Sequence, residues 1–459
     1  MASRPTGPRL DLPLGSPTTL GASRCSPLFP ELRLIHADLH NHSHLSDGAG
    51  DPAEFHAAAR AAGLDAAALT DHAIGGLGRR DYCALEPTVV GHVSACRTLR
   101  GLTDEGWHAA KDLARAADAP GRYTAIPGFE WSSAHLGHVN VWFGEVWTDA
   151  MATGGVTEEG LLRIGLSLER FADQLLTDFA DVITRSEVTD IVTAIRDREP
   201  AGMRPFYDWL ARQPEVGALT GFNHPYRESA SFDDFAYDPR LADRMVTVEL
   251  FNKCEDFLFR GVAAGGVSPL VACLDAGWRV GIIGTSDEHG ARWRNDEGKG
   301  RTGVWVRRLD RSGLREALLC RRVFATREAG LRLAASADGV PMGGTVPPRR
   351  EPVTFDVDID LGPSGDMRPV TVQVLRPGRP APVVAEQVTG IAGGRGTGVA
   401  PIRIAVALSR DDGEWVVLRI SDPSASNEAP APFEHPANDR ALAYSSPWWL
   451  GPRGRGTAS

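Results

Sequence analysis

Lysine is almost missing from this chain, and cysteine is sparse. Lysine occurs at only three of the 459 positions, Lys111, Lys253 and Lys299, so arginine supplies nearly all of the positive charge. The six cysteines show neither the close pairs of a zinc ribbon nor the spacing of a disulfide framework. We therefore expect a protein of the reducing cytoplasm that has no structural thiolate site.

Long apolar runs and a surplus of positive charge are also missing. No run approaches the roughly 20 residues of a membrane-spanning helix, and the first thirty residues lack the apolar stretch of a secretory signal. The net charge of −10 argues against a nucleic-acid partner, except in a local basic groove. These absences predict a soluble protein that acts on a small molecule, and they leave its oligomeric state open.

The residue pattern divides the chain into three parts. Residues 1–31 are rich in Pro, Gly, Ser and Thr and predict a flexible arm. Residues 32–328 alternate apolar runs with helical stretches, which is typical of an α/β domain with mostly parallel strands. Two long stretches inside this part, about 73–122 and 145–217, predict insertions that wall the site. Residues 329–459 alternate strands with Pro/Gly turns and predict a smaller all-β, sandwich-like domain.

The first candidate metal ligands follow the first predicted strand, residues 34–39. His40 and His42 lie on the same side of an extended chain, because strand side chains alternate with a period of two. Such a pair can bind one ion. Asp47 comes after a turn signalled by Ser46 and Gly48, and its carboxylate can return to the same ion.

Histidine, aspartate and glutamate residues also lie at the ends or starts of later predicted strands. The C-terminal strand ends of parallel α/β folds gather into one site. Burying several such groups together is costly unless metal cations compensate the carboxylates. The residues placed in this way are His72, Glu130, His138, His224, Asp287 and His289, with His135 as an alternative to His138. The histidines expected to be ordinary helix, loop or surface residues are His36, His44, His56, His92, His108 and His435.

Five short motifs, in order over about residues 34–328, resemble the PHP (polymerase and histidinol phosphatase) superfamily. Each motif is weak alone, but five in order are specific. They are Asp38-Leu39-His40-Asn41-His42 with Ser46-Asp47-Gly48, Thr70-Asp71-His72, Gly128-Phe129-Glu130, Asn223-His224-Pro225 and Ser286-Asp287-Glu288-His289. The layout of residues 128–131 and 137–141, followed by a C-terminal β domain, looks most like the carbaryl-hydrolase-like branch.

The resemblance implies a distorted seven-stranded (β/α) barrel with a trinuclear metal site. By matched position, His40 and His42 hold one metal, Asp287 faces it, and Glu130 bridges to the neighbouring metal. Glu249 belongs beside the ligands, with plain structural burial as the alternative. The other implied ligands are Asp47, His72 and His289 at further positions, and His138 and His224 on the remaining metal.

This ligand chemistry predicts a metal-dependent hydrolase. Mixed imidazole and carboxylate ligands suit two or three Zn, Mn or Fe ions, which would generate a bridging hydroxide as nucleophile. Glu130, Asp287 and His289 are the predicted catalytic residues. Phosphoester hydrolysis is favoured, because cations that suit phosphoryl oxygens neighbour the predicted ligands. These cations are Arg227, Lys253, Arg292 and Arg294.

Two alternatives remain open. An ester, amide or carbamate hydrolase would use the same metals with an apolar slot, for which Phe129, Trp131, Phe222 and Tyr226 are available. A non-catalytic metal-binding module is the other alternative. The module is disfavoured because none of the matched ligand positions carries an apolar replacement.

Overall fold

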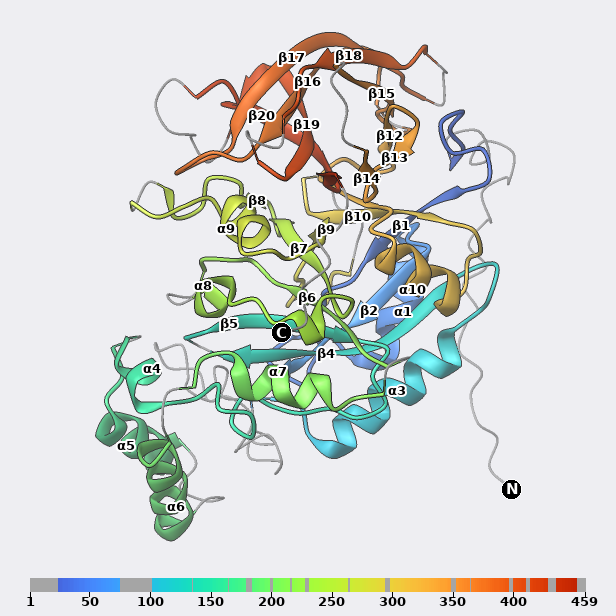
Figure 1. The fold of residues 1–459 in the computed structure, drawn as a ribbon. Helices are drawn as coiled ribbons and strands as arrows, with labels where there is room; N and C mark the ends of the chain where they lie inside the picture. Colours follow the sequence, from blue (N-terminus) through green and yellow to red (C-terminus); the bar gives the residue numbers. More distant parts are fainter. Residues whose placement is uncertain are drawn as a thin grey trace, which may run out of the picture.

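The computed structural model describes most of the chain between Arg24 and Gly451 (Figure 1). The described residues are 24–74, 101–133, 135–163, 165–178, 184–198, 201–214, 217–227, 231–262, 265–293, 298–347, 352–363, 365–395, 399–409, 413–427 and 435–451. Most of the predicted arm, the middle of the first predicted insertion, and Arg294 and His92 lie outside these residues. No helix of the described part is long and apolar enough to cross a membrane.

The first half of the described chain mixes strands and helices. Its strands are β1 (Arg33–Asp38), β2 (Ala66–Leu69), β3 (His72–Ala73), β4 (Thr124–Ser133), β5 (Gly137–Trp142), β6 (Leu219–Phe222), β7 (Met245–Asn252), β8 (Glu255–Asp256), β9 (Gly281–Thr285), β10 (Arg301–Val306) and β11 (Val323–Thr326). Its helices are α1 (Pro52–Ala61), α3 (Asp104–Ala117), α4 (Glu158–Arg163), α5 (Leu168–Asp178), α6 (Arg185–Arg196), α7 (Arg204–Ala211), α8 (Ser231–Phe235), the 3-10 helix η2 (Pro239–Leu241), α9 (Pro269–Asp275) and α10 (Arg311–Leu319).

Helix α1 shows how local sequence produces these elements. The Asp51 side chain accepts a hydrogen bond from the Ala53 N–H, and Pro52 occupies the first turn, where its missing N–H costs nothing. Phe55 and Ala59, one turn apart, face the core and are buried. The sequence predicts a helix over residues 55–62 with Asp51 as N-cap and Pro52 in its first turn, and the structure confirms it, with the helix ending at Ala61.

The sheet around these helices is mixed, so the prediction of mostly parallel strands is wrong. The pairs β1–β2, β2–β4, β6–β7 and β7–β9 are parallel. The pairs β4–β5, β5–β6, β1–β10 and β10–β11 are antiparallel. Strand direction depends on which distant segment pairs with which, and the pattern of apolar residues within one strand does not carry that information.

The chain segments that follow β1 and β9 lie side by side. The Asp287 N–H donates to the His40 carbonyl (3.0 Å), and the His42 N–H donates to the Glu288 carbonyl (2.9 Å). Asn41 and Glu288 form a parallel bridge between the two segments. The histidine pair after β1 and the Asp-Glu-His segment after β9 are therefore fixed against each other by the backbone.

The second half of the described chain is all β. Its strands are β12 (Arg332–Ala337), β13 (Val340–Pro341), β14 (Thr345–Val346), β15 (Val353–Asp360), β16 (Arg368–Arg376), β17 (Val383–Ala392), β18 (Ile402–Val406), β19 (Trp415–Ser426), β20 (Asp439–Ser445) and β21 (Trp448–Leu450). One group pairs in the order β17–β16–β19–β20, and another in the order β13–β12–β15–β18. Apolar side chains of both groups share one core cluster, including Val372, Leu418 and Phe355.

The two halves are joined by hydrogen-bonded strands. β11 pairs antiparallel with β20, with Ala325 opposite Tyr444. Tyr444 and Trp449 also belong to a core cluster that contains Phe251 and Leu270 of the first half. Backbone pairing and apolar packing therefore continue across the predicted boundary at residues 328/329, and the division into separate domains stays a prediction.

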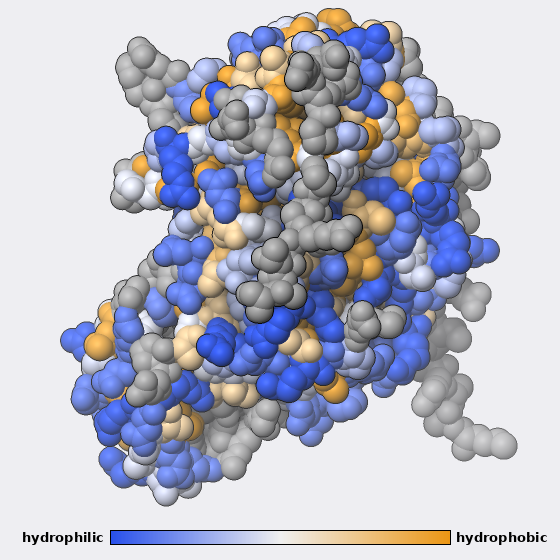
Figure 2. Space-filling model, in the orientation of Figure 1, coloured by the Kyte–Doolittle hydropathy of each residue, from blue (hydrophilic) through white to orange (hydrophobic). Residues whose placement is uncertain are grey.

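Helices α4, α5 and α6 lie within the second predicted insertion. They pack around a small apolar cluster of their own that includes Leu168, Leu175 and Ile195. Figure 1 shows these helices extending away from the sheet at the lower left, and in Figure 2 the surface of that region is mostly hydrophilic. The sheet and the residues that follow its strands, rather than these helices, position the candidate ligands described next.

Candidate metal centre

His40 and His42 converge as their period-two spacing predicts. Their Nε2 atoms lie 3.1 Å apart, and both side chains are fully buried. Two nitrogens bound to one ion at about 2.0–2.1 Å are roughly 3.0–3.4 Å apart in octahedral or tetrahedral geometry. The pair therefore has the spacing of two ligands of one cation.

Glu130, near the end of β4, lies among several imidazoles. Its side chain is fully buried, and it shares one side of the sheet with Ser132. Asn223 donates its Nδ2–H to Glu130 Oε1 at 2.7 Å. The imidazole nitrogens around this carboxylate belong to His40 (3.0 Å), His138 (3.2 Å) and His224 (3.4 Å) at Oε1, and to His72 (2.5 Å) at Oε2.

Asp287 follows β9 with a positive φ of 46°, in the left-handed region that is unusual outside glycine. Its Oδ1 lies 3.2 Å from His42 Nε2, 3.5 Å from His40 Nε2 and 3.4 Å from His289 Nδ1. Among the described residues, this buried oxygen accepts no hydrogen bond of regular geometry. A buried carboxylate oxygen that faces three imidazoles without a hydrogen bond fits a bound cation.

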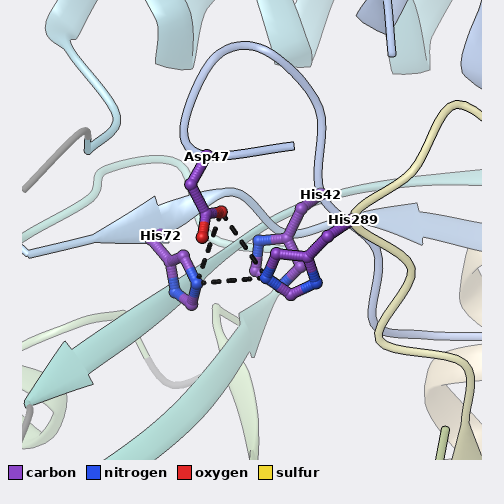
Figure 3. Close-up of side chains that lie close together, drawn as sticks. All are labelled: His42, Asp47, His72 and His289. Atoms are coloured by element: carbon purple, nitrogen blue, oxygen red, sulfur yellow. Dashed lines mark hydrogen bonds and ion pairs between the residues drawn. The ribbon is translucent and has the colours of Figure 1, made fainter. Parts of the chain in front are cut away.

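A second group of ligand atoms lies beside the first (Figure 3). His72 Nε2 and His289 Nε2 each lie 3.5 Å from Asp47 Oδ1 and 3.5 Å from each other. The His42 and His289 rings are stacked with their centroids 4.0 Å apart. Figure 3 shows Asp47 reaching this group from the loop after β1, so the carboxylate returns to the histidines as the sequence predicts.

Asp71 holds that loop in place. Its Oδ1 accepts hydrogen bonds from the Ser43 N–H (2.8 Å) and the Ser46 hydroxyl (2.6 Å), and its Oδ2 accepts from the Ser43 hydroxyl (2.8 Å). Burial raises the pKa of Asp71 to about 6, although these donors oppose the shift. The loop that carries His42 and Asp47 is thus fixed to the residue before His72.

The electrostatics of the cluster favour positive charge. Burial alone raises the pKa of Glu130 and of Asp287, yet the surrounding imidazoles bring both values well below the usual range. Burial lowers the pKa of His40, but Glu130, Asp287 and Glu249 outweigh it and raise the value well above the ordinary one. The carboxylates therefore require either protons on the imidazoles or metal cations between them.

His42 behaves in the opposite way. Burial, with the neighbouring His289 and His72, lowers its pKa well below the ordinary value. His42 therefore offers a neutral nitrogen, the form that binds metals. The pKa values of His40 and His42 shift in opposite directions because three carboxylates surround His40, whereas two further imidazoles adjoin His42.

The described residues form four overlapping groups that could hold metal ions. In each group, the ligand atoms all lie within 4.8 Å of one another. The groups are His42–Asp47–His72–His289, His40–Glu130–His224, His40–His42–Asp287 and His72–Glu130–His138. They contain all nine predicted ligands. The mixed nitrogen and oxygen donors suit divalent zinc, manganese or iron.

The described histidines outside these groups lie on helices, in loops or at the surface as expected, except His36, which is a buried residue of strand β1. His138 belongs to a group and His135 does not. His44 and His108 are exposed, and His435 contacts the Pro382 carbonyl at 2.9 Å. Burial lowers the pKa values of His36 and His56 to about 3, so both are neutral side chains within the fold.

Glu249, on β7, contacts His40 on the side away from the cluster. Its Oε1 lies 2.9 Å from His40 Nδ1 and accepts from the Thr285 hydroxyl at 2.7 Å. Its Oε2 accepts from the His224 N–H and from Asn252 Nδ2, each at 2.8 Å. A carboxylate on the far nitrogen fixes the ring orientation of a metal-binding histidine and raises its basicity.

Two of the four predicted substrate-binding cations lie beside the cluster. Arg227 Nη1 is 3.1 Å and Lys253 Nζ is 3.4 Å from Asp287 Oδ2, the oxygen opposite the one that faces the imidazoles. Both side chains are partly exposed. Arg292 is exposed and makes no ion pair within the described part of the chain. Arg294 lies outside that part.

Sequence reasoning missed the neutral partners of the ligands. Ser132 Oγ lies 2.7 Å from His72 Nδ1, Asn223 donates to Glu130, and Asn252 Oδ1 accepts from Arg227 at 2.9 Å. Ser132 lies two residues after Glu130, so the same alternation that paired His40 with His42 places it on the ligand side of the strand. No comparable spacing signal marks Asn252.

No family model matches the chain, and no curated protein matches it. One solved structure is a two-domain protein of Bacteroides vulgatus that contains a predicted PHP-like metal-dependent phosphoesterase. It has 15% identity and a TM-score of 0.39, and the match covers 90% of this chain and 96% of that one.

Two further solved structures are similar at the same low level. A protein of Bifidobacterium adolescentis described as a metal-dependent phosphoesterase has 17% identity and a TM-score of 0.31, with 62% of this chain and 96% of that one covered. An amidohydrolase of Chromobacterium violaceum, with bound sulfate and no metal, has 17% identity and a TM-score of 0.25, with 55% and 87% covered. Likenesses this low establish neither a family nor an activity. The geometry itself defines a mixed α/β protein with a buried cluster able to hold divalent metal ions.

Proposed function

We propose that the protein is a metal-dependent hydrolase of phosphoric esters. The observation that carries the proposal is the position of Asp287 between two kinds of positive charge. Its Oδ1 faces the imidazoles of the candidate metal centre, and its Oδ2 faces Arg227 and Lys253. A phosphoryl group bound between the metals and these two cations would have its charge balanced from both sides.

Each residue has a defined task in this proposal. Bound divalent cations would supply Lewis-acid charge and lower the pKa of a water molecule toward neutrality. Arg227 and Lys253 bind and orient the non-bridging oxygens. Glu130 and Asp287 hold the cations, and burial excludes bulk water from both carboxylates. The fully buried Glu249 keeps the His40 ring in its binding orientation.

His289 fits a ligand better than a proton donor. Its Nδ1 lies 2.9 Å from the Asp287 carbonyl, which can only accept, so Nδ1 carries the proton and Nε2 carries the lone pair. Nε2 is the atom that faces Asp47 and His72. Of the two roles predicted for His289 from the sequence, metal ligand and catalytic residue, we therefore propose only the ligand role.

The PHP superfamily remains the proposed family, with the five motifs of residues 38–289 as its support. The barrel form of residues 32–328, the trinuclear count and the carbaryl-hydrolase-like branch are parts of the same proposal. An ester or carbamate hydrolase is a weaker candidate, because three of the four aromatic residues available for an apolar slot, Phe129, Trp131 and Phe222, are fully buried in the core, and only the fourth, Tyr226, is partly exposed.

The test is an assay of metal-reconstituted protein against phosphomonoesters, phosphodiesters and uncharged aryl esters. The proposal predicts turnover of at least one phosphoester class and much slower turnover of aryl esters. Turnover of aryl esters alone would support the ester or carbamate alternative. Full metal loading without turnover of any substrate class would favour a binding module.

A further inference from the structure

Lys253 lies in a tight hairpin with an unfavourable backbone conformation. The hairpin joins β7 to β8, with Phe251 opposite Asp256 and Asn252 opposite Glu255. The φ angle of Lys253 is 53°, in the left-handed region that side chains other than glycine seldom adopt. Such a conformation persists only where the surroundings over-determine it, and it is common at functional sites.

The backbone of Lys253 is held on both sides within the first half of the chain. Its N–H donates to the Thr285 carbonyl at 3.1 Å, and its carbonyl accepts from the Gly300 N–H at 2.7 Å. Thr285 ends β9, two residues before Asp287. These bonds place the Lys253 side chain beside Asp287 but leave the far strand of the hairpin, β8, to be held by other contacts.

Arg327 supplies one of those contacts. It follows β11, is 1% exposed, and donates from Nη1 to the Cys254 carbonyl at 3.2 Å. Its guanidinium carbon lies 4.9 Å from the centre of the Phe251 ring. Its Nε and Nη2 donate to the Ala441 carbonyl on β20 at 3.3 and 3.0 Å. One side chain thus connects the turn of the hairpin to a C-terminal strand.

Tyr444, also on β20, supplies a second contact. Its hydroxyl donates to the Asp256 carboxylate, 2.9 Å from Oδ2, and its ring lies 5.1 Å from the Phe251 ring. Burial raises the pKa of Tyr444 well above its ordinary value, so the hydroxyl keeps its proton. The fully buried Arg419 donates from Nε to the tyrosine oxygen at 3.3 Å and is itself bound to Asp439.

We propose that Tyr444 of the C-terminal half and Arg327, which bonds to that half from just before the boundary, are positioning residues for Lys253, and that through them the β strands after residue 328 control how tightly the site binds a phosphoryl group. This inference rests on the proposed function, in which Lys253 binds the phosphoryl oxygens. Neither positioning residue touches that group. Each acts by holding the hairpin that carries the lysine.

The experiment uses the full chain reconstituted with Mn²⁺ and compares Tyr444→Phe with Tyr123→Phe. Each change removes one buried tyrosine hydroxyl; that of Tyr123 bonds to His56, away from the hairpin. Inorganic phosphate is titrated calorimetrically, and hydrogen–deuterium exchange is followed over residues 251–257. Tyr444→Phe is expected to weaken phosphate binding about three- to tenfold and to speed exchange in the hairpin, with metal content unchanged. Tyr123→Phe is expected to change neither.

The variant Lys253→Ala separates the inference from the function on which it rests. It should weaken phosphate binding about tenfold, and Tyr444→Phe should add nothing in the double variant, because its effect passes through the lysine. Wild-type phosphate affinity and hairpin exchange in Tyr444→Phe would overturn the inference alone, as would full additivity in the double variant. Unchanged phosphate binding in Lys253→Ala would overturn the proposed anion site, and the inference with it.

Discussion

Glu249 Oε1 lies 2.9 Å from His40 Nδ1, which turns the other nitrogen of the ring toward Glu130 and Asp287. All four groups around the Glu249 carboxylate can donate hydrogen bonds: two side chains, one backbone N–H and the imidazole itself. A carboxylate is the only side-chain end of this size that accepts from all of them.

Glu249→Gln should therefore weaken metal binding, although residue 249 is not itself a proposed metal ligand. The new NH₂ group must face either the His40 Nδ1 proton or the donors from His224 and Asn252. We expect metal affinity to fall about 10- to 100-fold, measured by competition with a chromogenic chelator. Glu316→Gln, on α10 and paired with Arg322, is the control. Equal affinity in both variants would show that Glu249 is only a buried structural residue.

Loss of a central ligand should remove activity altogether. His40→Ala, Glu130→Ala and Asp287→Ala should each lower turnover by several orders of magnitude while the circular dichroism spectrum stays that of the wild type, because no side chain can replace a missing cation. His44→Ala is the matched control, since His44 is exposed and lies two residues beyond His42. A loss in His44→Ala equal to that in His40→Ala would contradict the assignment of ligands, in which His44 has no part.

Arg227→Gln should affect charged substrates selectively. The guanidinium lies 3.1 Å from Asp287 Oδ2 and 2.9 Å from Asn252 Oδ1. Loss of a charge-assisted contact should raise KM for a phosphoester about 10- to 100-fold, while turnover of any uncharged aryl ester stays the same. Arg240→Gln removes an exposed arginine that pairs with Asp208 and Asp238, and should change neither value. Parallel losses on both substrates would mean that Arg227 supports Asp287 rather than the phosphoryl group.

His56 should make the fold sensitive to acid. Burial, with Arg311 and Arg60, lowers its pKa from 6.5 to about 3, so between these values the unfolded chain binds a proton that the folded chain does not. The contribution to the free energy of unfolding is therefore present above pH 6.5 and lost as the pH falls toward 3. The stability difference between wild type and His56→Gln should shrink by about 1.4 kcal/mol per pH unit in that window.

Urea unfolding across this range measures the difference. His108→Gln, which replaces an exposed histidine of α3, is the matched control. A pH-independent difference between wild type and His56→Gln would mean that His56 binds a proton in the folded protein as readily as in the unfolded chain.

Local sequence signals predicted the first strand, α1 and the nine candidate ligands. The N-cap Asp51 and the first-turn Pro52 predicted α1, and strand alternation predicted that His40 and His42 lie on the same side. The choice between His135 and His138 was not readable from spacing. It depends on where β5 begins and on its register, which sets His138 opposite Ser132.

The sequence did not predict features that depend on pairing between strands far apart in the chain. Strands β5 and β10 run antiparallel to the strands with which they pair, β4 and β1, and this direction depends on those partners. The pairing of β11 with β20 joins segments more than a hundred residues apart, so no pattern near the predicted boundary at residues 328/329 indicates it. Tyr444 and Asp256 gave no signal for the same reason, since each is an ordinary strand residue until the two meet.

Elemental analysis of the purified, anaerobically reconstituted full chain tests the central claim most directly. Nine candidate ligands in four overlapping groups exceed what one ion uses, so the account predicts two or three divalent transition-metal ions per chain. Phosphoester turnover should fall in proportion as a chelator removes them and should return on re-addition. A fully active protein with less than one equivalent of metal would contradict the site and the proposed function together.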